Sequence, residues 1–229
     1  MPNDPGIGLQ SLRLANLLIT LAFVALACPQ TVQADALRFQ VSDGGGNPLA
    51  DAVILLPGAI VAAPDTLAVM DQVAKTFQPH VLVIQRGQRV NFPNSDHIRH
   101  HVYSFSPAKP FEIKLYAGVP EQPLQFDTAG IVVLGCNIHD AMVGYIVVAD
   151  TPLAGKTDAQ GLLTLQSAPA KELRIWHPRL GSGTPQLQTL PMPAPGASGN
   201  IAIRLDVAPA TSASTSSTGF GNRFRPHGR

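Results

Sequence analysis

Short apolar runs, separated by turn signals, restrict the fold of this chain more than any other feature of its sequence. Between residues 81 and 150 the runs recur at intervals of roughly 8–12 residues and are rich in β-branched and aromatic residues. Glycine, proline and asparagine are frequent between them, and helical periodicity is weak. The sequence therefore predicts an all-β fold, arranged as a β-sandwich or barrel.

Individual strands can be placed from alternating polarity and from the turns that separate them. Residues 37–43 alternate apolar and polar side chains, and residues 51–58 form an apolar run. Residues 65–77 are ambiguous and fit either a short helix or a loop. The remaining strands are expected on both sides of Gly87 within 81–93, and over 99–106, 111–118, 123–130, 131–135, 143–150, 173–178 and 200–207.

The N-terminal segment has the pattern of a secretory signal peptide. Arg13 precedes an apolar run over 14–28, which is shorter than the roughly 20 residues of a membrane span. Small residues precede a cleavage point after Ala34. A lipid anchor at Cys28 is an alternative, but the residues before this cysteine fit such a signal poorly. We expect a cleaved signal peptide over 1–34, a periplasmic mature protein and no transmembrane segment.

Cleavage changes the cysteine content of the protein. The chain has 2 cysteines, and removal of the signal peptide leaves only Cys136. An intramolecular disulfide is then impossible, although the compartment is oxidising. A lone thiol in such a compartment is either buried as a small apolar residue or used as a ligand.

The charge distribution excludes one class of function. The 16 lysines and arginines nearly balance the 15 aspartates and glutamates, and they are scattered along the chain. A nucleic-acid-binding protein would present a basic patch, so no nucleic acid is expected as a partner. No Ser–His–Asp or paired-carboxylate arrangement is evident, and we do not expect an enzyme.

The stretch LGCNIHDAMVGY, residues 134–145, places Cys136, His139 and Met142 between two strand-like runs. A short loop can turn their thiolate, imidazole and thioether toward one point, and this soft ligand set suits copper. Zinc is an alternative, although a thioether is a poor zinc ligand. Ordinary packing of the three residues is the other alternative. Their combined spacing favours copper.

Two motifs resemble those of a known family. The run NSDHIRHHV, residues 94–102, resembles the segment that carries the first copper histidine in plastocyanins and amicyanins. CNIHDAM, residues 136–142, has the C-x-x-H-x-x-M spacing of the short amicyanin-type loop. Residues 81–150 thus resemble a cupredoxin domain. The longer region 68–178 is similar to cupredoxin-like proteins labelled methylamine utilization proteins.

The resemblance implies a Greek-key β-sandwich or barrel that holds one mononuclear type 1 copper. By position, the metal ligands would be His100, Cys136, His139 and an axial Met142. His101 is the alternative first ligand, because successive strand residues point to opposite faces of a sheet. Alternation along the strand does not decide between the two histidines.

The resemblance also implies a function. Protein ligands would fill every inner position of the copper, which leaves no place for a substrate. Such a protein carries single electrons between redox partners and contacts them transiently. His139 would reach the surface, with Ala141, Val143 and Pro120 around it. A copper-binding or copper-delivery protein without a redox partner is the alternative, and a β domain that has lost its metal is a third.

The regions on either side of the expected copper domain read as further β structure. We expect an N-terminal β segment at 35–67, the copper domain at 68–150, a C-terminal β segment at 151–208 and a disordered tail at 209–229, rich in serine, threonine and alanine. The two flanking β segments resemble the opening and closing parts of a transthyretin-like sandwich. One hypothesis is that the copper domain is inserted into such a sandwich or extends it.

Overall fold

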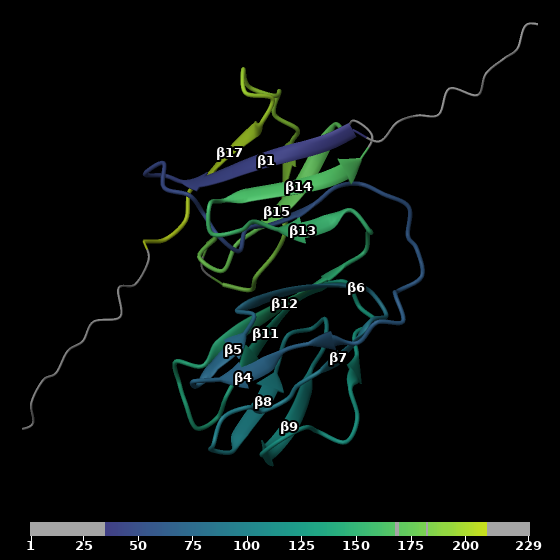
Figure 1. Cartoon of the computed structure of the whole chain (residues 1–229), viewed down its shortest axis with the longest axis vertical. Coiled ribbons are helices and arrows are strands. Elements are labelled where there is room, and N and C mark those ends of the chain that lie inside the picture. The colour runs from purple at the N-terminus through teal and green to yellow at the C-terminus, as the bar shows by residue number, and fades with distance from the viewer. Residues whose placement is uncertain (1–34, 168–169, 182, 210–229) are drawn as a thin grey trace, which may run out of the picture. The chain divides into compact units, whose positions relative to one another are not determined.

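A computed structural model describes residues 35–167, 170–181 and 183–209, and every regular element among them is a β-strand (Figure 1). The prediction of an all-β sandwich is therefore confirmed. The expected signal peptide and all of the expected tail except Pro209 lie outside the described residues. Within the described ranges, no helix has the length and apolar character needed to cross a membrane.

The strands follow one another in short steps along the chain. The first ten are β1 (Asp35–Asp43), β2 (Val53–Leu55), β3 (Ala68–Val69), β4 (Asp71–Val73), β5 (Thr76–Gln78), β6 (Val81–Gln85), β7 (Arg89–Asn91), β8 (His100–Ser104), β9 (Phe111–Tyr116) and β10 (Leu124–Gln125). The others are β11 (Gly130–Gly135), β12 (Val143–Ala149), β13 (Ala154–Lys156), β14 (Leu162–Ser167), β15 (Glu172–Trp176), β16 (Gln188–Pro191) and β17 (Ile201–Leu205).

The ambiguous region before β6 contains short strands and no helix. Residues 65–77 hold β3, β4 and most of β5, and β4 and β5 form an antiparallel hairpin. The hairpin turn is made by Ala74 and Lys75, which have positive φ angles of 51° and 59°. Strands of two or three residues are too short to show alternation, which explains why the sequence did not reveal them.

The N-terminal and C-terminal β segments share their sheets. β1 pairs with β14 in the antiparallel sense and with β17 in the parallel sense. β2 lies between β13 and β15, and β16 pairs with the far side of β15. Apolar side chains from both sheets form one buried cluster, which includes Phe39, Val41, Ile54 and Ile175. The chain thus leaves this pair of sheets after β2 and returns to it at β13.

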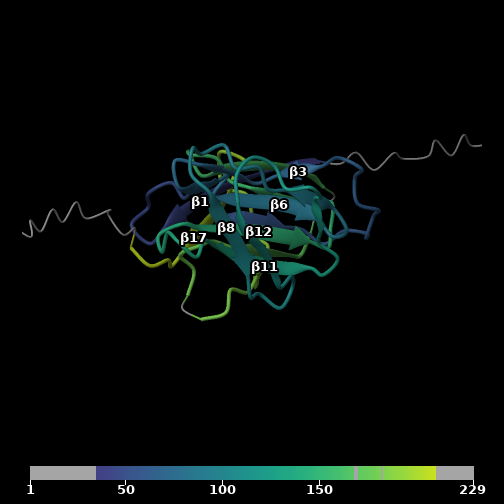
Figure 2. The same cartoon turned by 90° about the horizontal axis from the view of Figure 1, so that it is seen from below.

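The residues between β2 and β13 form the part of the fold that contains the cysteine loop, which is the connection 136–142 between β11 and β12. Its largest sheet has the order β6-β12-β11-β8-β9, and Figure 2 shows β6, β12 and β11 of this sheet side by side. A smaller sheet has the order β10-β7-β3. The two sheets enclose a hydrophobic cluster that includes Phe92, Phe126, Leu134 and Ile146. Cys136 and Met142 belong to the same buried cluster.

Gly161 occupies a turn before β14 that a larger residue cannot enter without strain. Its φ angle is +73°, and an added Cβ would lie 2.3 Å from the carbonyl oxygen of Val41. We expect Gly161→Ala to lower the free energy of unfolding by about 1–3 kcal/mol, because left-handed backbone strain and a steric clash with backbone act together.

Gly199→Ala is the matched control for this prediction. Gly199 has a similar φ angle of +76°, but no atom lies within 4 Å of its added Cβ. Gly199→Ala should therefore show only the cost of placing alanine in a left-handed backbone conformation, and should lose less stability than Gly161→Ala. Urea denaturation followed by circular dichroism measures both. Equal losses in the two variants would contradict the proposed clash with Val41.

Candidate metal centre

The cysteine loop connects two strands that are held together up to its ends. β11 and β12 are antiparallel partners, and their last pair before the loop is Gly135 with Val143. Within the loop, the Met142 amide donates a hydrogen bond to the His139 carbonyl oxygen, with an N···O distance of 2.9 Å. This turn leaves Cys136 and Met142 buried, with 4% and 1% of their surfaces exposed. The loop is therefore anchored at both of its ends.

Gly135 allows an aromatic side chain to cover the end of β11. Gly135 pairs with Tyr103 of β8, and an added Cβ at position 135 would lie 2.7 Å from a ring carbon of Tyr103. The absence of a side chain thus lets the tyrosine ring pack directly over the residue that precedes Cys136. This pairing also sets the register of β8 against the cysteine loop.

The register of β8 places His100 on the inner face of the sheet. Burial alternates along β8, so that His100, Val102 and Ser104 are buried whereas His101 and Tyr103 are partly exposed. His100 is fully buried, and its Nδ1 atom lies 3.7 Å from Cys136 Sγ. The pairing of β8 with β9 is irregular between His100 and Val102. Such bulges are common beside functional sites, where they redirect side chains.

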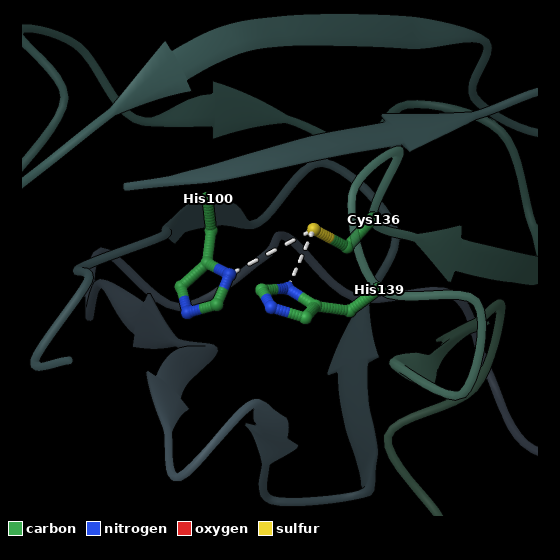
Figure 3. Close-up of side chains that lie close together, drawn as sticks. All are labelled: His100, Cys136 and His139. Carbon is green, nitrogen blue, oxygen red and sulfur yellow. Dashed lines mark hydrogen bonds between the residues drawn. The ribbon is translucent and has the colours of Figure 1, made fainter. Parts of the chain in front are cut away.

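His139 brings a second imidazole to the same sulfur. Its Nδ1 atom lies 3.8 Å from Cys136 Sγ, and Figure 3 shows both histidine rings turned toward the thiol. The ring centroids of His100 and His139 are 5.0 Å apart. One ligand atom from each of the three residues lies within 4.8 Å of the others. The loop and β8 thus converge on one point.

These distances fit a single bound metal ion. A metal that binds sulfur at about 2.3 Å and nitrogen at about 2.0 Å in a trigonal arrangement holds the two ligand atoms about 3.7 Å apart. The two S···N distances of 3.7 and 3.8 Å match this separation. A buried thiol with two imidazoles is a soft donor set, of the kind that binds copper or zinc.

The other residues named from the sequence have different positions. His101 lies on the opposite face of β8, where its Nε2 atom is 3.0 Å from Glu112 Oε1. The geometry therefore brings His100, and not His101, to Cys136. Met142, the fourth predicted ligand, is buried in the hydrophobic cluster that also contains Cys136.

One residue beside the site was missed by sequence analysis. Asp96 lies in the segment between β7 and β8, and its Oδ2 atom is 2.7 Å from His100 Nε2. Partial burial acts to raise the pKa of Asp96, but hydrogen bonds from Lys75, His100 and Ala74 hold this pKa below its ordinary value. Asp96 is therefore a carboxylate at neutral pH. The sequence signal was only an acidic residue four positions before a histidine, which is too common to interpret.

Hydrogen bonds fix the segment that carries Asp96. The Asn94 side-chain amide donates to the carbonyl oxygens of Ile98 and Tyr116, each at 2.9 Å. The Tyr116 hydroxyl donates to the Phe92 carbonyl oxygen at 2.6 Å. Burial raises the pKa of Tyr116 to about 12, so the hydroxyl remains a donor across the physiological pH range. The segment before His100 is thus held at several points.

Comparisons with known proteins give partial structural matches. No family model matches the chain, and no curated protein matches it. A copper-containing nitrite reductase from Thermus scotoductus SA-01 is similar at 24% identity and a TM-score of 0.35, over 48% of this chain. The chain spans 28% of that reductase.

Two smaller proteins are similar over most of their own length. A purple cupredoxin from Nitrosopumilus maritimus matches at 21% identity and a TM-score of 0.32, over 36% of this chain and 99% of its own. A mutant of amicyanin in its reduced Cu(I) form matches at 23% identity and a TM-score of 0.32, over 42% of this chain and 98% of its own. Each similarity covers less than half of the chain.

Proposed function

We propose that the protein binds one copper ion and carries single electrons between redox partners. The observation that carries this proposal is the convergence of two imidazole Nδ1 atoms on one buried thiol, at 3.7 and 3.8 Å. His100, Cys136 and His139 would hold the metal, with Met142 as the fourth ligand. Copper bound there would supply a Cu(I)/Cu(II) couple. The surrounding residues would keep the ligands in place while one electron is gained or lost.

Burial of the ligands supports a carrier over a delivery protein. His100 is fully buried and Cys136 is 4% exposed; His100 lies on β8, and Cys136 directly follows β11 of the same hydrogen-bonded sheet. A delivery protein must release its metal to a partner, which favours exposed and mobile ligands. A rigid site instead keeps a similar geometry in both oxidation states. Copper delivery without a redox partner remains the second candidate function, and a wild-type protein that binds Cu(I) but stays colourless with Cu(II) would favour it.

The surface beside His139 suits a transient partner. His139 is partly exposed, and its neighbour Ile138 is 51% exposed. Ala141 is exposed, whereas Val143 and Pro120 are partly buried. Small apolar surfaces are typical of short-lived redox contacts, which bury less than about 1,200 Å². We propose that electrons enter or leave through His139, in the periplasm, where the predicted signal peptide would direct the protein.

The test is spectroscopic and uses the mature protein after loading with Cu(II). We expect one copper per chain, an intense visible absorption band from the thiolate–copper bond and a narrow copper hyperfine splitting in the EPR spectrum. The band should disappear on reduction and return on reoxidation, as electron transfer requires. The zinc-loaded protein is the control and should be colourless. A Cu(II)-loaded protein without the band would overturn the proposal.

A further inference from the structure

Asp96 connects the proposed metal site to a hairpin that lies outside it. One carboxylate oxygen, Oδ1, accepts a hydrogen bond from the Ala74 amide at 2.7 Å. The other, Oδ2, accepts from the Lys75 amide at 2.9 Å and lies 2.7 Å from His100 Nε2. The side chain of Asp96 is 15% exposed, whereas that of His100 is fully buried. The carboxylate is therefore held from one side by backbone and meets the histidine from the other.

The hairpin geometry explains why two successive amides reach the same carboxylate. Ala74 and Lys75 both have left-handed backbone angles, with φ of 51° and 59°. Successive N–H groups in a turn can form a concave site for an anion. Two donors at 2.7 and 2.9 Å restrain both oxygens of Asp96, so the carboxylate cannot turn freely. The position of Asp96 is thus fixed independently of any metal.

The contact with Asp96 decides which ring nitrogen of His100 carries a proton. An ionised carboxylate only accepts hydrogen bonds, so the 2.7 Å contact requires a proton on His100 Nε2. In the neutral imidazole, Nδ1 then has a free lone pair. Nδ1 is the atom that lies 3.7 Å from Cys136 Sγ. The contact with Asp96 therefore prepares the correct nitrogen for a metal.

We propose that Asp96 is a positioning residue that fixes the tautomer and ring orientation of His100 and, through its negative charge, favours Cu(II) over Cu(I). The second part rests on the proposed copper function. Carboxylate partners of metal-binding histidines orient the ring and make it a stronger ligand. A nearby negative charge stabilises the more highly charged oxidation state more strongly. Among the described residues, no lysine or arginine forms an ion pair that would neutralise Asp96.

The substitution Asp96→Asn tests the charge in the copper-loaded protein. It keeps the size of the side chain but removes its charge. We expect the ratio of Cu(II) to Cu(I) affinity to fall about tenfold, which is an increase of about 59 mV in the midpoint potential. Redox titration at one fixed pH measures this change. An unchanged midpoint potential would overturn the proposed role of the charge.

Asp71→Asn is the matched control. Asp71 accepts a hydrogen bond from the Ser95 hydroxyl at 2.8 Å and so supports the same segment, but the carboxylate that contacts His100 is that of Asp96. It should leave the midpoint potential nearly unchanged. An equal increase in both variants would mean that loosening of the segment, and not the contact with His100, sets the potential, and would contradict the proposal.

A second measurement needs neither a variant nor copper. Nitrogen-15 NMR of the metal-free wild-type protein reports which ring nitrogen of His100 carries the proton. We expect the Nε2–H tautomer, and the Nδ1–H tautomer would overturn the proposal. If the wild-type protein shows no thiolate–copper band, the proposed function fails and the charge effect on copper fails with it. The NMR result still decides the Asp96–His100 contact separately.

Discussion

Replacing Cys136 by serine is expected to abolish the intense visible band of the copper-loaded protein. The band arises from charge transfer between a thiolate and Cu(II), and Cys136 is the only thiol that remains after the predicted cleavage. A serine hydroxyl is a harder and weaker ligand for copper. The EPR spectrum should also change from narrow to ordinary hyperfine splitting. Absorption and EPR spectra of both proteins, loaded in parallel, measure the effect.

His101→Gln is the negative control for this loss of the visible band, and His100→Gln is the positive control. His101 lies on the outer face of β8, with its Nε2 atom 3.0 Å from Glu112, so its replacement should preserve the band. His100 has its Nδ1 atom 3.7 Å from Cys136 Sγ, so its replacement should shift or weaken the band strongly. A Cys136→Ser protein that remained intensely coloured would disprove thiolate ligation at this position.

Trp176→Ala is expected to cause the largest loss of stability among the substitutions considered. Trp176 is 1% exposed and belongs to a buried cluster with Val53, Val81 and Val147. This cluster contains residues of β2 and β15 as well as β6 and β12, so it joins the flanking sheets to the sheet of the metal centre. The Trp176 ring centroid is 5.1 Å from that of Tyr145. Removing such a side chain leaves a cavity and typically costs about 3–5 kcal/mol.

Chemical denaturation measures this loss. Unfolding is followed by far-ultraviolet circular dichroism and not by tryptophan fluorescence, since the variant lacks the chain's 1 tryptophan. Phe105→Ala is the control, because Phe105 is 85% exposed and should change the free energy of unfolding by less than about 0.5 kcal/mol. Similar losses in the two variants would show that the Trp176 cluster does not hold the two sets of sheets together.

The strand pattern was predictable where an apolar or alternating run covers five or more residues. β8 and β12 each fall inside a run recognised from the sequence, and β11 begins one residue before its run at 131–135. Burial on one face of a strand imposes a two-residue period, and burial on both faces gives a continuous apolar run. β3, β4 and β5 were missed, since two or three residues cannot display that period. Their place in the fold depends on pairing with β7 and with each other.

The candidate site was likewise predictable from the sequence only in part. Cys136, His139 and Met142 were recognised together, because all three lie in one short loop and their spacing is local. The family resemblance favoured His100 over His101, but alternation alone left that choice open, because it shows that they face opposite sides but not which side is inner.

The sequence by itself determined the β character of the chain and the ligand types of the cysteine loop, because both follow from spacing between near neighbours. Only the tertiary structure decided that His100 faces Cys136, through the pairing of Tyr103 with Gly135. It alone brought Asp96 to His100 and to the hairpin amides of Ala74 and Lys75. These contacts join segments that are distant along the chain or lie in irregular backbone, and the two-residue period within one strand does not show which partner strand or loop lies opposite it.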